Sequence, residues 1–375
     1  MRKVAVFFGG KSCENEISIL TGMFIYNLID REKFSPFPVY IHTDGEMYTS
    51  PSMSNVDVFK EVKVSKFEKI FFNGGSVYAL NAKKCKIKKL AKIDVAINCC
   101  HGGLGEGGGV SALVEWNNIP FASPDLTSSG VLIDKSMTKL VARALNVPTV
   151  DYIRVNEKDY ERRGAFLLKT IKSRLKYPVI IKPAHLGSSI GISLAENEEA
   201  LKTALQSAFA LDSRVIIEKY LPSKQDVNCA AYSLGGKVIV SEPELAFGEG
   251  IYSFEDKYVK RSNDFTSPLS TKGGGRYALN GELREKIRAY TRTLYKRMDL
   301  QGAVRMDFLI SEGKAYLCEV NTVPGSLAYY LFCDRIIEAK QFFTDLLEDA
   351  IKRGEEEKKK VISTGILHAV RWKRK

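Results

Sequence analysis

The sequence of 375 residues contains no apolar run that could span a lipid bilayer, for which about 20 consecutive apolar residues are needed. Its seven cysteines are an odd number and include no Cys-x-x-Cys pair, which argues against a disulfide framework and against a zinc site. The apolar N-terminus, MRKVAVFFGG, is too short for a signal peptide and leads into Gly-Gly as a first β-strand would. No nucleic-acid-binding module is recognisable. These absences favour a cytoplasmic protein that contacts neither membranes nor nucleic acids.

Positive charge is in excess but unevenly distributed. The net charge at pH 7 is +12, and the segment Lys358–Lys375 alone holds seven Lys or Arg residues and no acid. We expect this segment to be a solvated tail. The chain is too long for one compact core, and its 45% hydrophobic and 27% charged residues are ordinary for a globular protein. Two or three domains are therefore predicted.

The segment Gly302–Gly325 predicts two β-strands joined by a turn. Arg305 and Asp307 would share one face of the first strand, and Glu319 and Asn321 one face of the second. A three-residue turn would set Asp307 opposite Glu319 and Arg305 opposite Asn321, whereas a two-residue turn would shift the register and separate them. The first register gathers an all-oxygen ligand set that suits Mg²⁺. The same pattern also fits an exposed polar hairpin in which Arg305 simply pairs with Asp307.

Strand-like and helix-like segments alternate along the chain, which predicts an α/β fold. The first strand leads through a glycine turn into a helix near Glu14, with Ser12 as its cap, as in a doubly wound domain. Strands are expected at Val4–Phe8, Phe37–Ile41, Val95–Cys100, Ile119–Ala122, Tyr177–Pro183, Arg214–Leu221, Val227–Leu234 and Lys237–Val240. Further helices are expected at Val110–Asn117, Asp134–Leu145, Glu157–Leu175, Glu196–Ala208, Leu283–Met298 and Ile336–Lys352.

Two glycine-rich segments follow strands. The glycines of His101–Gly109 imply close approach to a ligand or to another backbone. Ala184–Gly191 offers backbone N–H groups and two serine hydroxyls, as a lid over phosphates would, although a plain β-turn has a similar composition. Neither segment has the spacing of a P-loop or of a dinucleotide-binding motif. Phe247–Ala278 has no clear periodicity, and such long segments are often functional.

Seven motifs occur in an order that resembles the D-alanine–D-alanine ligases of the ATP-grasp superfamily. They are GGKSCENEIS, HGGLGEGG, the Asp134-Lys135 pair, VIIKPAHLGSSIGIS, EKYL, FEDKY, and RMDFLI followed by CEVNTVPG. The match runs from Val4 to about Lys352. It implies three α/β domains with an ATP-grasp fold: a doubly wound domain at 1–122 with the first substrate site, a central domain at 123–211, and a C-terminal domain at 212–352 with the metal site, followed by a basic tail at 353–375.

The resemblance also implies an activity. The carboxylate of one D-alanine would attack the γ-phosphate of ATP to give an acyl phosphate, which the amine of a second D-alanine would then attack. The product serves peptidoglycan precursor synthesis, and the family implies a homodimer. A non-catalytic nucleotide-binding protein with this fold is an alternative, but it would not need all the metal-ligand positions to be filled.

The resemblance assigns cofactor roles to several residues. Two Mg²⁺ ions, for which Mn²⁺ can substitute, would be held by Asp307, Glu319 and Asn321, with Glu319 bridging. Phosphate contacts fall to Lys135, Lys182 and Lys257, and the adenine hinge to Glu218, Lys219 and Leu221. Asp226 lies near the position of the family's ribose-binding glutamate and is one methylene shorter.

Other residues are assigned to the two substrates. Glu14 would hold the ammonium of the first D-alanine and form a triad with Ser188 and Tyr258 that closes two loops. Arg305 and the Gly325 amide would stabilise the oxyanion, and His101 would lie beside the first substrate unless it is structural. Tyr330 stands where the family has a serine for the acceptor carboxylate, so Arg305 and the Leu331 amide become alternative donors. D-lactate, D-serine or another amino acid is therefore the alternative acceptor.

Overall fold

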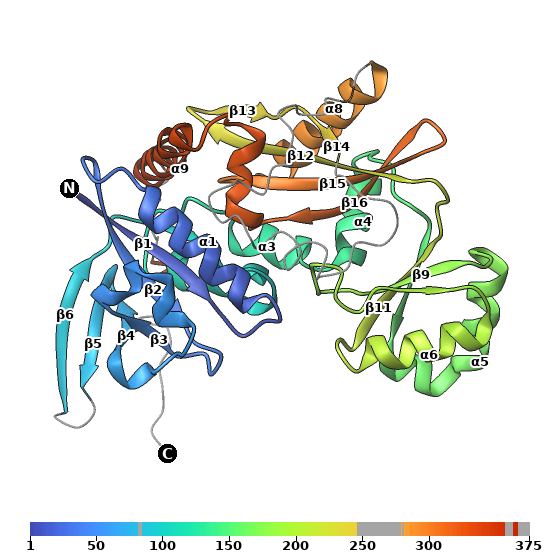
Figure 1. Ribbon diagram of the computed structural model, residues 1–375, viewed down its shortest axis with the longest axis horizontal. Coiled ribbons are helices and arrows are strands. Elements are labelled where there is room, and N and C mark those ends of the chain that lie inside the picture. Colours follow the sequence, from blue (N-terminus) through green and yellow to red (C-terminus); the bar gives the residue numbers. More distant parts are fainter. Residues whose placement is uncertain (82–84, 246–278, 280, 357–362, 367–375) are drawn as a thin grey trace.

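Figure 1 shows a computed structural model of the chain, which describes residues 1–81, 85–245, 279, 281–356 and 363–366. In these residues the strands form three β-sheets, each covered by helices. The predicted loop Phe247–Ala278 and most of the basic tail lie outside the described residues. None of the described helices is both long and apolar enough to cross a membrane.

The first sheet has the order β6-β5-β4-β3-β2-β1-β7. Its parallel part was predicted and consists of β1 (Arg2–Gly9), β2 (Phe34–Ile41) and β7 (Val95–Asn98). Its antiparallel part was not predicted and consists of β3 (Met47–Thr49), β4 (Glu68–Asn73), β5 (Ser76–Asn81) and β6 (Lys86–Lys92). The expected strand at Ile119–Ala122 is reduced to one bridge between Phe121 and Ala96.

This domain includes the helices α1 (Asn15–Leu28) and α2 (Val110–Trp116) and a π-helical turn (Gly105–Gly109) before α2. Short 3₁₀ turns follow β3 at Pro51–Ser54, Val56–Phe59 and Val64–Lys66. Ser12 does not cap α1 as predicted. Its hydroxyl donates to the His101 carbonyl at 2.6 Å and accepts from the Glu14 N–H at 3.2 Å, and Glu14 itself occupies the N-cap position. Ser12 therefore links the glycine turn after β1 to the glycine-rich segment that begins at His101.

The second sheet is antiparallel, with the order β10-β9-β11-β8. Its strands are β8 (Tyr152–Asn156), β9 (Val179–Pro183), β10 (Ser193–Ala195) and β11 (Arg214–Lys219), and helices α5 (Glu157–Arg174) and α6 (Glu198–Phe209) cover one face. Because β11 pairs with both β8 and β9, the change from the second sheet to the third comes after Lys219, whereas the domain boundary was predicted at Leu211.

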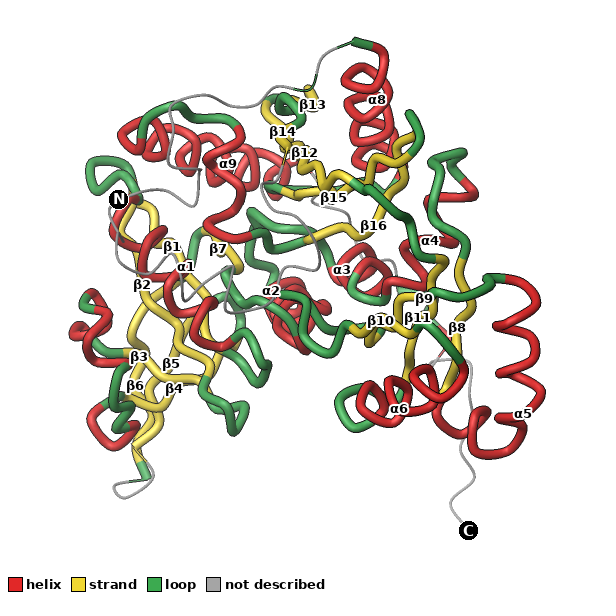
Figure 2. Tube along the Cα trace, turned by 45° about the vertical axis from the view of Figure 1, so that its right-hand side comes forward, coloured by secondary structure: helices red, strands yellow, loops and turns green. Residues whose placement is uncertain are grey.

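The third sheet has the order β13-β12-β15-β16, with β14 paired to β12. Its strands are β12 (Gln225–Leu234), β13 (Lys237–Val240), β14 (Glu244–Leu245), β15 (Val304–Ser311) and β16 (Lys314–Asn321), and it is accompanied by α3 (Leu126–Leu132), α4 (Lys135–Ala144) and α8 (Glu282–Arg297). Figure 2 shows α9 (Ile336–Glu356) beside both this sheet and the first one. Its Phe342 and Phe343 share one hydrophobic core with Phe8 of β1 and Tyr232 of β12, which joins the two domains.

A β-bulge in β16 decides the register of the central hairpin. The strands are joined by a two-residue turn, Glu312-Gly313, with φ angles of 49° and 71° as a type I′ turn requires. The pattern predicted the useful pairing only for a three-residue turn, which is absent. The pairing forms nevertheless, because the register shifts by one between Asp307 and Phe308 and leaves Cys318 as an extra residue. Asp307 thus lies opposite Glu319.

Candidate active site

A cavity of about 1170 Å³ lies between the second and third sheets and reaches the glycine segment of the first domain. Most of the predicted site residues line it: Glu14, His101, Lys135, Lys182, Ser188, Glu218, Lys219, Leu221, Asp226, Arg305, Asp307, Glu319, Asn321, Gly325 and Tyr330. Leu331 does not line this cavity, and its side chain is buried beside Ala230 and Ala328. Lys257 and Tyr258 lie outside the described residues.

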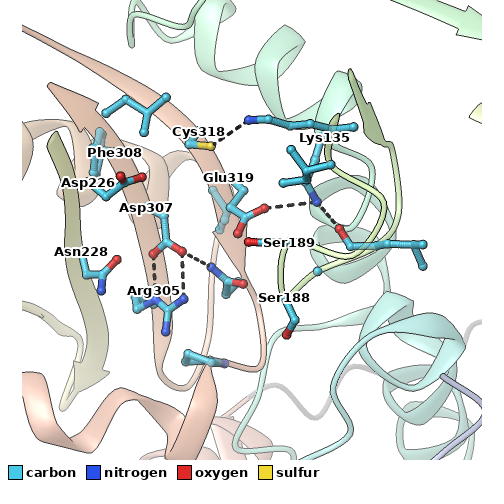
Figure 3. A pocket seen from close by; sticks show the side chains of 18 of the residues that line it. Lys135, Ser188, Ser189, Asp226, Asn228, Arg305, Asp307, Phe308, Cys318 and Glu319 are labelled. Carbon is cyan, nitrogen blue, oxygen red and sulfur yellow. Dashed lines mark hydrogen bonds and ion pairs between the residues drawn. The ribbon is translucent and has the colours of Figure 1, made fainter. Parts of the chain in front are cut away.

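The cavity face of the hairpin carries both charge signs (Figure 3). Arg305 donates two hydrogen bonds to Asp307, from Nε at 2.7 Å and from Nη2 at 2.8 Å. The Asn321 amide donates to Asp307 Oδ2 at 3.0 Å. Burial lowers the pKa of Arg305, but the Asp307 carboxylate outweighs this effect and keeps it above its ordinary value. The Arg305–Asp307 pair of the simpler prediction therefore exists, but it lines a cavity and not an exposed surface.

Lys135 approaches this face from helix α4. Its ammonium lies 3.1 Å from Glu319 Oε2 and donates to the Leu186 carbonyl at 2.6 Å. Asp134 fixes the start of the helix by accepting from the N–H groups of Ser136 at 2.8 Å and Met137 at 3.2 Å. Burial lowers the pKa of Lys135, but Glu319 outweighs it, so the pKa is raised and the ammonium stays charged.

A second, deeper set of ion pairs lies around Glu218. Its Oε2 atom is 2.8 Å from Lys182 Nζ, and its Oε1 atom is 2.9 Å from Lys139 Nζ. Glu218 is 2% exposed, and Lys139 is completely buried. Burial raises the pKa of Glu218, but the two ammonium groups outweigh it and hold the pKa at about 2. The Glu218 side chain is therefore occupied by two lysines.

The serine-containing loop between β9 and β10 meets the first domain at Glu14. Ser188 donates a hydrogen bond to Glu14 Oε1. Two glycines make this approach possible, because a Cβ at Gly102 would lie 2.7 Å from Glu14 Oε2 and one at Gly187 would lie 2.8 Å from the same oxygen. This part of the predicted triad is therefore assembled, while its tyrosine is not described.

His101 is buried beside the segment that follows β16. Its Nε2 atom lies 2.8 Å from the Thr21 hydroxyl. Burial and the nearby Arg305 lower its pKa to about 4, so the imidazole is neutral at pH 7. It is thus a satisfied buried group that also lines the cavity.

Tyr330, at the position predicted to contact the acceptor, lines the cavity. Its hydroxyl accepts a hydrogen bond from Arg305 Nη1 at 3.1 Å. The preceding residues Ser326, Leu327 and Ala328 have φ angles of 49°, 52° and 53°, which form a left-handed turn. This turn brings the phenol to Arg305, which was itself predicted to stabilise the oxyanion. Asp226, which also lines the cavity, pairs with Lys224, so its contact with a ribose stays a prediction.

Several residues of the site were not predicted. Lys139 lies one helical turn after Lys135 on α4, so the helical period could have placed both on one face. Cys318 lines the cavity with its Sγ atom 3.6 Å from Lys182 Nζ. Glu106 accepts from the Gly102 N–H at 2.8 Å, and no local signal points to its other contacts.

Models of one family match both parts of the chain: "D-ala D-ala ligase N-terminus" matches residues 3–124 and "D-ala D-ala ligase C-terminus" matches residues 141–352. The chain belongs to the D-alanine–D-alanine ligase family. A ligase of this family from Thermosipho africanus is 31% identical over 367 residues, which are 97% of each chain. Another from Chlorobaculum tepidum is 32% identical over 330 residues, 86% of this chain and 88% of its own. The family predicted from the motifs is confirmed.

Solved ligase structures share the fold. The D-alanine–D-alanine ligase from Helicobacter pylori has a TM-score of 0.74 at 27% identity and covers 94% of this chain and 98% of its own. Two further structures show the fold alone: the Bacillus anthracis enzyme complexed with ATP, with a TM-score of 0.66 at 22% identity (95% and 100% covered), and the VanG D-Ala:D-Ser ligase from Enterococcus faecalis, with 0.72 at 23% (94% and 99%). The predicted ATP-grasp fold is thereby confirmed.

Proposed function

We propose that this chain is an ATP-dependent ligase that joins two D-alanines in peptidoglycan precursor synthesis. The observation that carries the proposal is the convergence of three elements on one cavity. The hairpin contributes Asp307 and Glu319, helix α4 contributes Lys135, and the loop after β9 contributes Ser188, which meets Glu14. The volume of about 1170 Å³ exceeds the roughly 300–1,000 Å³ of a typical small-molecule site, which suits ATP together with two amino acids.

The lysines are the phosphate-binding groups of this proposal. Lys135 pairs with Glu319 and Lys182 pairs with Glu218, so both ammonium groups line the cavity with carboxylate partners. When ATP binds, its phosphates would compete with these carboxylates for the lysine donors. Backbone groups at Lys219 and Leu221 would contact adenine, Asp226 would contact the ribose, and Lys257 would add a further cation.

The hairpin fits Mg²⁺ in the number and type of its donors. Asp307, Glu319 and Asn321 supply two carboxylates and one amide, which are hard oxygen ligands. No group of three or more His, Cys, Asp or Glu side chains that could hold a metal occurs among the described residues, so phosphate oxygens of ATP would complete the coordination. Two bound Mg²⁺ ions, with Glu319 between them, would neutralise charge on the transferring phosphate.

The remaining residues handle the two amino acids. Glu14 would bind the ammonium of the first D-alanine, whose carboxylate attacks the γ-phosphate and releases ADP. The amine of the second D-alanine then attacks the acyl-phosphate carbonyl, loses a proton, and displaces inorganic phosphate. Arg305 and the Gly325 amide would stabilise the oxyanion of that step. Ser188 and Tyr258 would close the loops and keep water from the acyl phosphate.

A different acceptor is the second candidate, and Tyr330 is the observation that favours it. Its phenol already accepts a hydrogen bond from Arg305, so the acceptor pocket differs from one lined by a serine. D-Lactate, D-serine or another amino acid would then occupy this end of the cavity. The first half of the reaction, phosphate transfer to a D-alanine carboxylate, is the same in both proposals.

The deciding experiment measures phosphate release and product mass with ATP, D-alanine and a panel of D-amino acids and D-lactate. We expect D-alanyl-D-alanine as the main product. Glu319→Gln should remain folded and lose most of its turnover, because it removes negative charge from the proposed metal site. Glu312→Gln, in the exposed turn of the same hairpin, is the matched control and should keep full activity. Normal turnover of a folded Glu319→Gln protein would contradict the assignment of the hairpin.

Two further properties follow from the family alone. We propose a homodimer and a cytoplasmic location, with the domain roles of the sequence analysis and the third domain beginning after Lys219. Sedimentation of the purified chain tests the dimer, and cell fractionation tests the location.

A further inference from the structure

The segment after β16 has a backbone that needs outside support. Ser326, Leu327 and Ala328 have φ angles of 49°, 52° and 53°, a left-handed conformation that non-glycine residues rarely adopt. Such a conformation persists only where surrounding contacts determine it. The segment begins at Thr322 and carries Gly325, the proposed oxyanion donor, so its placement matters for the reaction.

The support comes from the first domain. Glu106 Oε1 accepts from the Val323 N–H at 3.3 Å and lies 3.4 Å from the donating Thr322 hydroxyl. The Thr21 hydroxyl accepts from the Ser326 N–H at 3.4 Å. These contacts join side chains that are more than 200 residues from the segment in sequence, with separations of 217 residues for Val323 and 305 for Ser326. The hydrogen bonds hold the backbone on both sides of Gly325.

The second oxygen of Glu106 reaches the first-substrate site. Glu106 Oε2 accepts from the Gly102 N–H at 2.8 Å. Gly102 in turn lies against the carboxylate proposed to bind the first D-alanine, because a Cβ there would lie 2.7 Å from Glu14 Oε2. One carboxyl group therefore connects the backbone beside Glu14 with the backbone just before Gly325.

The position of Glu106 requires a group with two acceptors. Glu106 is 9% exposed and lies within a π-helical turn of glycines, Gly105–Gly109. Burial raises its pKa to about 7, whereas the hydrogen bonds from the Gly102 and Val323 N–H groups favour the carboxylate and oppose this shift. A glutamine would be neutral but offers one acceptor oxygen and an NH₂ group that faces a donor. The carboxyl group is thus matched to two N–H donors from different domains.

We propose that Glu106 is a positioning residue, which fixes the segment from Thr322 to Ala328, with its oxyanion donor Gly325, relative to the first-substrate site. It does not touch the reacting atoms. It holds Val323 and Thr322 through one oxygen and Gly102 through the other, so that the carbonyl of the bound first substrate meets the Gly325 amide in one geometry. The kinetic part of this proposal rests on the proposed function, and its structural part does not.

The test compares Glu106→Gln, Thr322→Val and the double variant with the full-length protein. The matched control is Glu115→Gln, an exposed glutamate of α2 that accepts from the Leu126 N–H at 2.9 Å. Hydrogen–deuterium exchange of peptides covering residues 320–328 is measured without substrates. Steady-state kinetics then give kcat and the KM for ATP separately.

Glu106→Gln should speed exchange in residues 320–328 and lower kcat by about 10- to 100-fold, the effect of leaving one buried N–H donor without its acceptor. The KM for ATP should change less than about two-fold, because no nucleotide-binding residue is altered. Thr322→Val should lower kcat by a smaller factor, and the double variant should be about as slow as Glu106→Gln, since both act through one contact. Glu115→Gln should change neither exchange nor kcat.

Unchanged exchange in folded Glu106→Gln overturns the proposal, as does a double variant whose loss equals the product of the single losses. If Glu106→Gln does not fold, Thr322→Val decides, because it keeps the carboxylate and removes one donor. If the wild-type chain makes no dipeptide, the proposed function fails, while the exchange experiment still tests the role of Glu106.

Discussion

The buried Lys139–Glu218–Lys182 cluster allows a quantitative prediction for Lys139→Met. The substitution keeps a long apolar side chain in a completely buried position but removes one of the two charges that compensate Glu218. The pKa of Glu218 lies at about 2 instead of 4.5, which corresponds to about 3 kcal/mol of stability at about 1.4 kcal/mol per pKa unit. Because the pKa is depressed in the folded state, this stability is present above pH 4.5 and is lost as the pH falls toward 2.

We expect Lys139→Met to cost about 3 kcal/mol at pH 7, near the lower end of the roughly 3–5 kcal/mol for removing one partner of a buried pair. The lower end applies because Lys182 still pairs with Glu218 at 2.8 Å. The pKa of Glu218 should rise, so that acid unfolding begins at higher pH than in the wild type. The same variant should bind ATP more weakly. Lys182 would be the one lysine of this pair left to compensate Glu218, so it would be less available to the phosphates of ATP.

The assay is urea unfolding without nucleotide at pH 7 and at pH 4, followed by an ATP titration. Lys286→Met is the control, because Lys286 pairs with Glu282 on the exposed surface of α8, and it should change neither curve. A Lys139→Met protein with wild-type stability and wild-type acid sensitivity would refute the role given to this buried lysine.

The other two predictions concern the acceptor end and the tail. Tyr330→Ser removes the phenol that accepts from Arg305, so it should keep activity on D-alanine and widen the acceptor range; kcat/KM for D-alanine, D-serine and D-lactate in both proteins measures this. A natural protein that already prefers a large acceptor would contradict it. Deleting Lys358–Lys375 should leave the ligase rate nearly intact, because the family match ends at residue 352, and a large loss would show that the tail supports the site or an oligomer.

Much of the local structure could be predicted from the sequence because periodicity reports which face of an element is buried. The β1–turn–α1 unit and helices α4, α5, α6, α8 and α9 are examples. The failure at Ser12 has a different cause: its hydroxyl found a tertiary partner, the His101 carbonyl, in place of the helix end. The membership of β11 in the second sheet also could not be predicted from its own residues, since its pairing partners lie about 30 to 65 residues away in the sequence.

Contacts within one hairpin could be proposed from its residues, whereas contacts between distant segments came from the family resemblance, as for Ser188 and Glu14, or were missed. Asp307 and Glu319 belong to one hairpin, so strand alternation could propose them as partners, but their pairing depends on the bulge that alternation did not predict. Glu106 meets Val323 across 217 residues of sequence, and no pattern in either segment predicts that contact. The bulge did leave a signal, because the buried apolar residues of β16 are Ala315, Leu317 and then Val320, a spacing that breaks the period of two.

The bulge also determines where this hairpin can change in length. Leu317 lies opposite Phe308 and Glu319 opposite Asp307, so the residue between them is the one without a cross-strand partner. A chain lacking Cys318 would keep both pairs and the two-residue turn. A chain lacking Val320 would instead bring Asn321 opposite Met306 and turn its amide toward the core. Deleting Cys318 would therefore keep Asp307, Glu319 and Asn321 on one face of the hairpin, whereas deleting Val320 would remove Asn321 from that face.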